Sequence, residues 1–174
     1  MKKGFTLLEL LIVIGILAIL ATTVTLVLNP AELLKQARDS QRLGDLGSVH
    51  AALSMYAATA TTSPLFTATT TCTFATSTGP FPPACATNSN TSVSGSGWVN
   101  IDFNQTSGGS PLSRLPLDPV QSALYHYAFK NDDGQNTWEL DAVLESNKYS
   151  PQMTSDGGNN NNYYEIGSDP GLNL

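Results

Sequence analysis

The residues with the most evident chemistry lie at the start of the chain. Lys2 and Lys3 form a short basic head that ends at Gly4, and Glu9 places a carboxylate inside an apolar run that reaches Leu28. An apolar run of this length predicts a membrane-spanning helix. A carboxylate is costly inside such a helix unless a partner or water neutralises it. The function of this segment therefore depends on what surrounds Glu9.

Three interpretations of the apolar segment are open. A cleavable secretory signal has an apolar region of about 7–15 residues and then a small-residue cleavage site, but this region is longer and residues 29–31 offer no obvious site. A plain membrane anchor fits, because a helix over residues 5–28 would extend about 36 Å, with the preceding lysines held in the cytoplasm. The third interpretation is an anchor that is also an assembly surface, and Glu9 favours it.

The segment Gly4-Phe5-Thr6-Leu7-Leu8-Glu9 resembles the class III signal of type IV pilins and pseudopilins. In that family a membrane peptidase cuts after the glycine and methylates the new amine. The resemblance implies cleavage between Gly4 and Phe5, N-methylation of Phe5, and an assembly role for Glu9 as the fifth mature residue. It also implies a leader of residues 1–4, a transmembrane and assembly helix over residues 5–29, and a periplasmic or extracellular head over residues 30–174.

Cleavage after Gly4 would create a partner for Glu9. The new amine of Phe5 is positively charged near neutral pH, and a carboxylate four residues further on lies about one helical turn away. In a bundle of parallel helices, we expect Glu9 of one subunit to face the Phe5 amine of an axially displaced neighbour, which selects one register. The alternative is a carboxylate that stays hydrated at the cytoplasmic interface.

The chain after the apolar run is predicted to remain helical. Residues 31–42 are good helix formers, and Leu46, Val49, Leu53 and Tyr56 recur at three- and four-residue spacing, which indicates one buried face. We expect one long helix over about residues 5–58, with a bend or a short unwound stretch near Pro30. The charged side chains of its second half are expected on the exterior: Glu32, Lys35, Arg38, Asp39, Arg42 and Asp45.

The strands are expected late in the chain. Residues 123–129 are rich in aromatic side chains, residues 132–134 predict a turn, and residues 137–144 alternate with Trp138 and Leu140 on one face. A further short strand is expected over residues 98–103. The predicted fold class is α+β and pilin-like: the long N-terminal helix packs on a small antiparallel sheet at about 98–145. A Thr-rich loop at about 59–97 precedes the sheet, and a loop-rich tail follows it.

Cys72 and Cys85 are the two cysteines of the chain. If the lysines fix the topology, both lie outside the cytoplasm, where a disulfide persists. The closed loop would hold about fourteen residues and contribute about 3 kcal/mol in the chain-entropy model. A zinc site is disfavoured because no histidine lies nearby to complete a four-ligand shell. A structural disulfide is therefore the favoured interpretation.

The acidic tail offers ligands for a hard cation. Asp156, Ser168 and Asp169 provide oxygen atoms on turn-rich segments, which calcium accepts. Major pseudopilins of type II secretion carry a calcium site in their C-terminal loops, and the resemblance implies calcium here. The alternative is a solvent-exposed tail without metal. No other cofactor is expected.

Composition and motifs argue against nucleic-acid binding and catalysis. The net charge is −6 and the sequence pI is about 4.6, which disfavours nonspecific nucleic-acid binding. His50 and His126 are the only histidines and are expected to be structural. The sequence has no nucleotide-binding P-loop, no hydrolase nucleophile elbow and no zinc-protease motif. We therefore expect no enzymatic activity, and energy for assembly has to come from a separate ATPase.

The resemblance implies a structural subunit of a type IV pilus or pseudopilus filament. Such a subunit enters the cytoplasmic membrane once, with its N-terminus inside. It is cut by a prepilin peptidase and polymerises as a helical homo-oligomer with an assembly platform. The filament then lies on the cell surface or spans the periplasm. The alternatives are a minor pilin or a membrane-anchored binding module for adhesion or DNA uptake, and, less favoured, a tethered enzyme.

Overall fold

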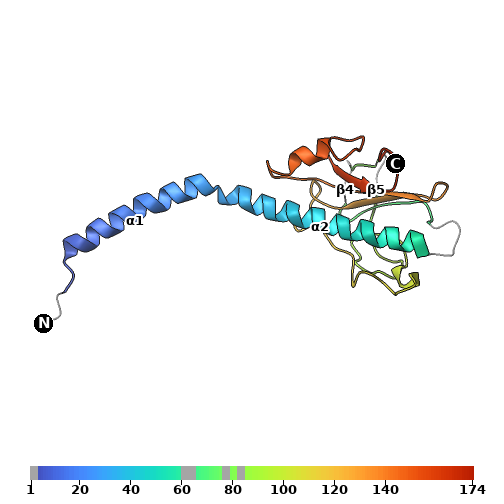
Figure 1. Cartoon of the computed structure of the whole chain (residues 1–174), viewed down its shortest axis with the longest axis horizontal. Helices are drawn as coiled ribbons and strands as arrows, with labels where there is room; N and C mark the ends of the chain where they lie inside the picture. The colour runs from blue at the N-terminus through green and yellow to red at the C-terminus, as the bar shows by residue number, and fades with distance from the viewer. Residues whose placement is uncertain (1–3, 60–65, 76–78, 82–84) are drawn as a thin grey trace. The chain divides into compact units, whose positions relative to one another are not determined.

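The computed structural model describes residues 4–59, 66–75, 79–81 and 85–174. The chain divides into two compact units, one ending at Lys35 and the other running from Gln36 to Leu174. The boundary lies within the second helix, α2 (Pro30–Thr59). Figure 1 colours the chain from blue at the N-terminus to red at the C-terminus and labels α1, α2, β4 and β5.

The first unit is dominated by the apolar helix α1 (Leu7–Leu28). Thr6 caps its N-terminus, and Asn29 ends it in the left-handed conformation with φ of 40°, which asparagine adopts more readily than most residues. Pro30 then opens α2, where its missing N–H leaves no hydrogen bond unmade. The single long helix predicted over residues 5–58 is therefore interrupted, one residue before the proline where a bend was expected.

The second unit forms its core between α2 and a sheet. Leu46, Val49, Leu53 and Tyr56 are buried on one face of α2, as their spacing predicts. Burying side chains of this size contributes about 1.5–3 kcal/mol each. The sheet and the loops supply the other half of this core cluster: Phe66, Trp98, Val99, Ile101, Phe103, Leu115, Tyr127, Phe129, Trp138, Leu140 and Ala142.

The sheet has five strands in the order β2-β1-β3-β4-β5. They are β1 (Thr69–Cys72), β2 (Ala86–Thr87), β3 (Ala128–Asp132), β4 (Thr137–Ala142) and β5 (Tyr164–Gly167). The pair β1–β2 is parallel and the other pairs are antiparallel. The fold is α+β as predicted, with a mixed sheet in place of an antiparallel one.

The sheet also extends beyond the predicted range of 98–145. The strand β1 lies within the predicted Thr-rich loop, because a run of β-branched threonines suits extended structure, and it pairs with β2 on one side and β3 on the other. The strand β5 comes from the predicted tail. Residues 98–103 were expected to form a strand, and this prediction was wrong. They contribute one isolated bridge, Ser94 with Asp102, before the 3₁₀ helix Phe103–Gln105.

The predicted hairpin is confirmed as β3 and β4. Phe129 pairs with Leu140 and Lys130 with Glu139, and the Asp132 side chain accepts hydrogen bonds from two backbone amides of the turn. Because side chains alternate along a strand, Trp138 and Leu140 face the core, whereas Glu139 points to the other side. That other side is also buried, because the C-terminal tail covers it.

The disulfide between Cys72 and Cys85 is confirmed. Its Cα atoms lie 5.5 Å apart, within the usual range for a disulfide. Both cysteines pack with Phe81 and Ala128 in a small second cluster. Because Ala128 is two residues from Lys130 on β3, this cluster lies on the sheet face that carries Glu139.

Two charged residues of α2 were expected on its exterior, and this prediction was wrong. Asp39 and Arg42 are fully buried. The Arg42 Nε atom donates to Asp118 at 2.6 Å, and its Nη1 atom donates to Asp39 and to Glu145, each at 2.8 Å. The two residues continue the Leu46 and Val49 stripe one and two turns earlier, so helical periodicity turns them inward.

Asp39 and Arg38 complete this ion network. The Asp39 carboxylate accepts from the backbone amides of Glu145 and Ser146. Arg38 binds the two oxygens of Glu145 at 2.6 and 2.8 Å, and this interaction lowers the pKa of Glu145. The network therefore joins α2 to residues that follow β4 and to the loop that carries Asp118.

Replacing the buried cation tests the importance of this network. We expect Arg42→Met to reduce the free energy of unfolding by about 3–5 kcal/mol, because Asp39 and Asp118 would remain buried without it. Urea unfolding of the full chain in detergent, followed by the fluorescence of the buried Trp98 and Trp138, measures the change. Arg38→Met is the matched control. Its side chain is 33% exposed, so we expect a loss of at most about 1 kcal/mol. Equal losses of unfolding free energy in both variants would contradict the central role of Arg42 in the network.

The disulfide gives a second stability prediction. Joint replacement of Cys72 and Cys85 by serine should lower the free energy of unfolding by about 3 kcal/mol, because the unfolded chain regains the entropy of the open loop. The same urea titration measures it, with and without dithiothreitol. The reductant should lower the free energy of unfolding of the native chain to nearly that of the variant, and it should leave the value for the variant unchanged. A native chain that is insensitive to reduction would refute the prediction.

Candidate functional site

The helix α1 presents apolar side chains on all sides. The consecutive residues Leu10, Leu11, Ile12 and Val13, which point in four different directions around the helix, are all exposed. Among the described residues, Leu7–Thr25 is the one helical stretch with the length and composition to cross a membrane. A helix that is apolar all round needs lipid or other helices as its surroundings.

The polar side chains within α1 are satisfied by the helix itself. The Thr22 hydroxyl donates to the carbonyls of Ala18 and Ile19, and the Thr23 hydroxyl donates to the carbonyl of Leu20 at 2.8 Å. Thr25 bonds back to its preceding turn in the same way. These hydroxyls therefore demand no water, which is the condition for a stable position in an apolar medium.

Glu9 has a local partner that the sequence analysis missed. Its Oε2 atom accepts hydrogen bonds from the Thr6 amide at 2.9 Å and from the Thr6 hydroxyl at 2.7 Å. The Glu9 amide donates to the Thr6 hydroxyl at 3.2 Å. This arrangement is a capping box, and its sequence signal, a threonine three residues before a glutamate, stands in the printed chain. The pairing of Glu9 with a neighbouring Phe5 amine stays a prediction.

The expected cleavage site lies just before α1. Gly4 and Phe5 are exposed and precede the Thr6 cap, outside the helix. Among the described residues beyond its direct chain neighbours, no group lies within 4 Å of the position that a Gly4 side chain would take. An exposed, non-helical backbone is the form in which a peptidase can bind a peptide bond.

The predicted calcium ligands of the tail are engaged in shaping it. Asp156 accepts from the amides of Gly158 and Glu165 at 3.0 and 2.9 Å. The Ser168 hydroxyl accepts from the Trp138 amide, and Asp169 accepts from the Thr137 hydroxyl and the Asn173 amide. Joint binding of calcium by Asp156, Ser168 and Asp169 stays a prediction.

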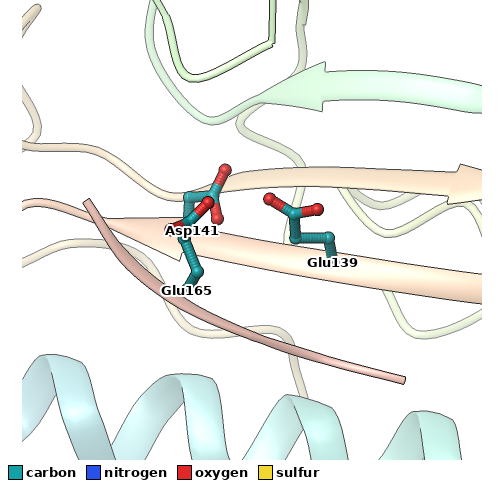
Figure 2. A group of neighbouring side chains, drawn as sticks. All are labelled: Glu139, Asp141 and Glu165. Atoms are coloured by element: carbon teal, nitrogen blue, oxygen red, sulfur yellow. The ribbon is translucent and has the colours of Figure 1, made fainter. Parts of the chain in front are cut away.

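A different group of acids is brought together in the head. Glu139, Asp141 and Glu165, which we call the carboxylate cluster, offer oxygens that all lie within 4.8 Å of one another (Figure 2). All three are buried. Burial raises the pKa of Glu139 to about 7, and it also raises the pKa of Asp141 and of Glu165.

The sequence contains one signal for this cluster. Glu139 and Asp141 alternate with Trp138, Leu140 and Ala142, so they share one face of β4. The alternation predicts the core side of β4 and does not show what covers the face that carries the acids. The third member, Glu165, is paired opposite Asp141 by the register of β5, and no spacing in the sequence announces it.

The two histidines lie inside the head. The His50 Nδ1 atom accepts from the Trp138 indole at 3.4 Å, and the two rings lie 5.8 Å apart. His126 is buried at the end of the loop before β3. Burial lowers the pKa of both imidazoles, which favours their neutral forms.

Comparison with protein families identifies the prokaryotic N-terminal methylation motif at residues 1–25. Comparisons with curated proteins and with solved structures give no match. The motif covers the predicted cleavage site and most of α1. It implies processing by a prepilin peptidase and pilus assembly in general terms, and together with the apolar helix it indicates a membrane-anchored protein. The chain therefore carries the class III signal typical of type IV pilins and pseudopilins, followed by a pilin-like α+β head.

Proposed function

We propose that this protein is a structural subunit of a type IV pilus or pseudopilus filament. It is held in the cytoplasmic membrane by α1, cut between Gly4 and Phe5, methylated at Phe5 and polymerised through α1. The observation that carries the proposal is the methylation motif at residues 1–25, on a helix whose apolar side chains are exposed on every side. Residues 1–4 are then the leader, residues 5–29 the assembly helix, and residues 30–174 the head.

Packing, and not simple hydrophobic burial, has to determine the order of α1 in a filament. A leucine or isoleucine moved from water to a protein interior contributes about 1.5–3 kcal/mol. The same side chain moved from lipid contributes less, because lipid is already apolar. A polar contact that forms in only one register therefore has a large effect on filament geometry.

Glu9 can make that contact without giving up its cap. Both donors of Thr6 bind the Oε2 atom. Within the residues that the structure describes, no hydrogen bond is recorded to the Oε1 atom. A methylated amine on Phe5 of an adjacent subunit can donate to Oε1 while the capping box remains intact. Charge-assisted hydrogen bonds of this kind contribute about 1.5–3 kcal/mol each.

Two variants separate the cap from the charge at this position. Glu9→Gln keeps an acceptor for Thr6 and loses the charge, and we expect filament yield to fall roughly 10–100-fold for a loss of about 1.5–3 kcal/mol. Thr6→Val weakens the cap by about 1 kcal/mol and keeps the carboxylate, so filaments should persist. The yield of sheared filaments, measured by immunoblot against equal membrane-inserted pools, gives both values.

The opposite outcome would assign Glu9 a purely local role. If Thr6→Val lost its filaments while Glu9→Gln kept them, the capping box would be the function of this acid. Glu9→Leu removes both the charge and the acceptor, so it should insert into the membrane normally and assemble poorly. Normal assembly of that variant would refute the intersubunit pair.

Processing gives an independent test of the proposed function. Mass spectrometry of filaments sheared from cells should find a chain that begins at Phe5 and carries one methyl group on its amine. Replacement of Gly4 by a bulky residue, Gly4→Leu, should leave the leader attached and the protein in the membrane, because the peptidase cuts after glycine. A filament protein that still begins at Met1 would refute the proposal.

A further inference from the structure

The carboxylate cluster is built by the pairing of two strands. Glu139 and Asp141 lie two residues apart on β4, and Asp141 is directly opposite Glu165 on β5. Their side chains therefore share the sheet face that points away from the core with α2. Figure 2 shows the three carboxylates turned toward one another.

The backbone of the C-terminal tail covers the carboxylate cluster. The Asn160 amide donates to Glu165 at 2.9 Å, and the Leu174 amide donates to Glu139 at 3.0 Å. Gly158 lies so close that a Cβ atom there would stand 2.1 Å from a Glu165 oxygen. The cluster is thus enclosed by a loop and by the end of the chain, and little water can reach it.

Asp141 is the member without a partner. Its side chain is 1% exposed, and neither of its carboxylate oxygens has a hydrogen-bond partner among the described residues. A buried carboxylate in this condition strongly destabilises a fold unless it is protonated or bound by a cation. Its two oxygens face a space that already contains two further carboxylates.

Among the described residues, no basic side chain forms an ion pair with the cluster. Lys130 is paired with Glu139 in the sheet, but its ammonium lies over the Phe81 ring, 5.6 Å from the ring centre. In the described parts of the chain the recorded ion pairs all belong to Arg38 and Arg42, and none reaches the cluster. Asp156 and Asp169 add further negative charge nearby.

We propose that Glu139, Asp141 and Glu165 bind one calcium ion between β4 and β5. The ligand set is purely carboxylate oxygen, which suits a hard divalent cation and not a thiolate- or imidazole-seeking metal. Calcium fits better than magnesium, because magnesium usually keeps several of its water molecules, whereas calcium accepts a shell made largely of protein oxygens. The proposed ligands are strand residues, and they differ from the tail residues that the sequence suggested.

Calcium titration of the full chain in detergent tests this site. The protein is first stripped with EGTA and desalted, and calcium chloride is then added. We expect one ion per chain by calorimetry and a rise in Tm of roughly 5–10 °C at a hundredfold excess over the dissociation constant. Magnesium chloride should give a clearly smaller rise. An unchanged Tm without measurable binding would overturn the site, and an equal response to magnesium would overturn the assignment to calcium.

The variant Asp141→Asn distinguishes an ion ligand from a structural acid. Asp141→Asn removes the charge with little change in volume. Without calcium it should be at least as stable as the native chain, because a buried anion is removed. It should also lose the calcium-dependent rise in Tm. Asp133→Asn, on the exposed hairpin turn, is the matched control and should keep the full rise.

A variant of the tail locates the ion. Asp169→Asn keeps acceptor capacity for the Thr137 hydroxyl, and it should retain calcium binding if the ligands are those of the cluster. Loss of binding in Asp169→Asn together with its retention in Asp141→Asn would overturn the proposed ligand set. Filament assembly is not read in any of these measurements, so their outcome is independent of the proposed function.

Discussion

The head of this protein depends on one positive charge that has no access to water. The Arg42 guanidinium is fully buried and binds Asp39 from its own helix, Asp118 from 76 residues further on, and Glu145 from 103 residues further on. A buried guanidinium is tolerated only when its donors are satisfied. The helix, the loop around Asp118 and the segment after β4 therefore reach their native positions together, or the charge stays unpaired.

The two faces of the sheet treat charge in opposite ways. On the side of α2, the two cations Arg38 and Arg42 pair with three carboxylates. On the other side, three carboxylates are buried together, and the lysine in register with Glu139 is turned toward a phenylalanine ring. The same residue types thus stabilise the fold on one face and create a demand for an external partner on the other.

Local sequence patterns correctly predicted the features that depend on residues close together in the chain. The apolar run, the stripe from Leu46 to Tyr56, the β3–β4 hairpin and the disulfide follow from periodicity, turn residues and cysteine count. The burial of Arg42 was missed because its charge outweighed its place on the stripe. A buried position for Arg42 can be expected only if its acidic partners Asp118 and Glu145 are known. These partners reach Arg42 only through tertiary folding.

The missed strands and the carboxylate cluster have the same cause. The strand β1 consists of three threonines and one cysteine and has no apolar–polar alternation, so only its pairing with β3 reveals it. The alternation of β4 correctly placed Trp138 and Leu140 on the core. It could not show that the opposite face is covered as well, because the residues of β5 that pair with β4 lie 22 or more positions further along the chain.

The threonines of α1 have a kinetic consequence. Because each hydroxyl donates to a carbonyl of its own helix, exchanging acyl chains for protein neighbours breaks no hydrogen bond at Thr22, Thr23 or Thr25. Movement of α1 between lipid and protein surroundings then meets no desolvation barrier at these hydroxyls.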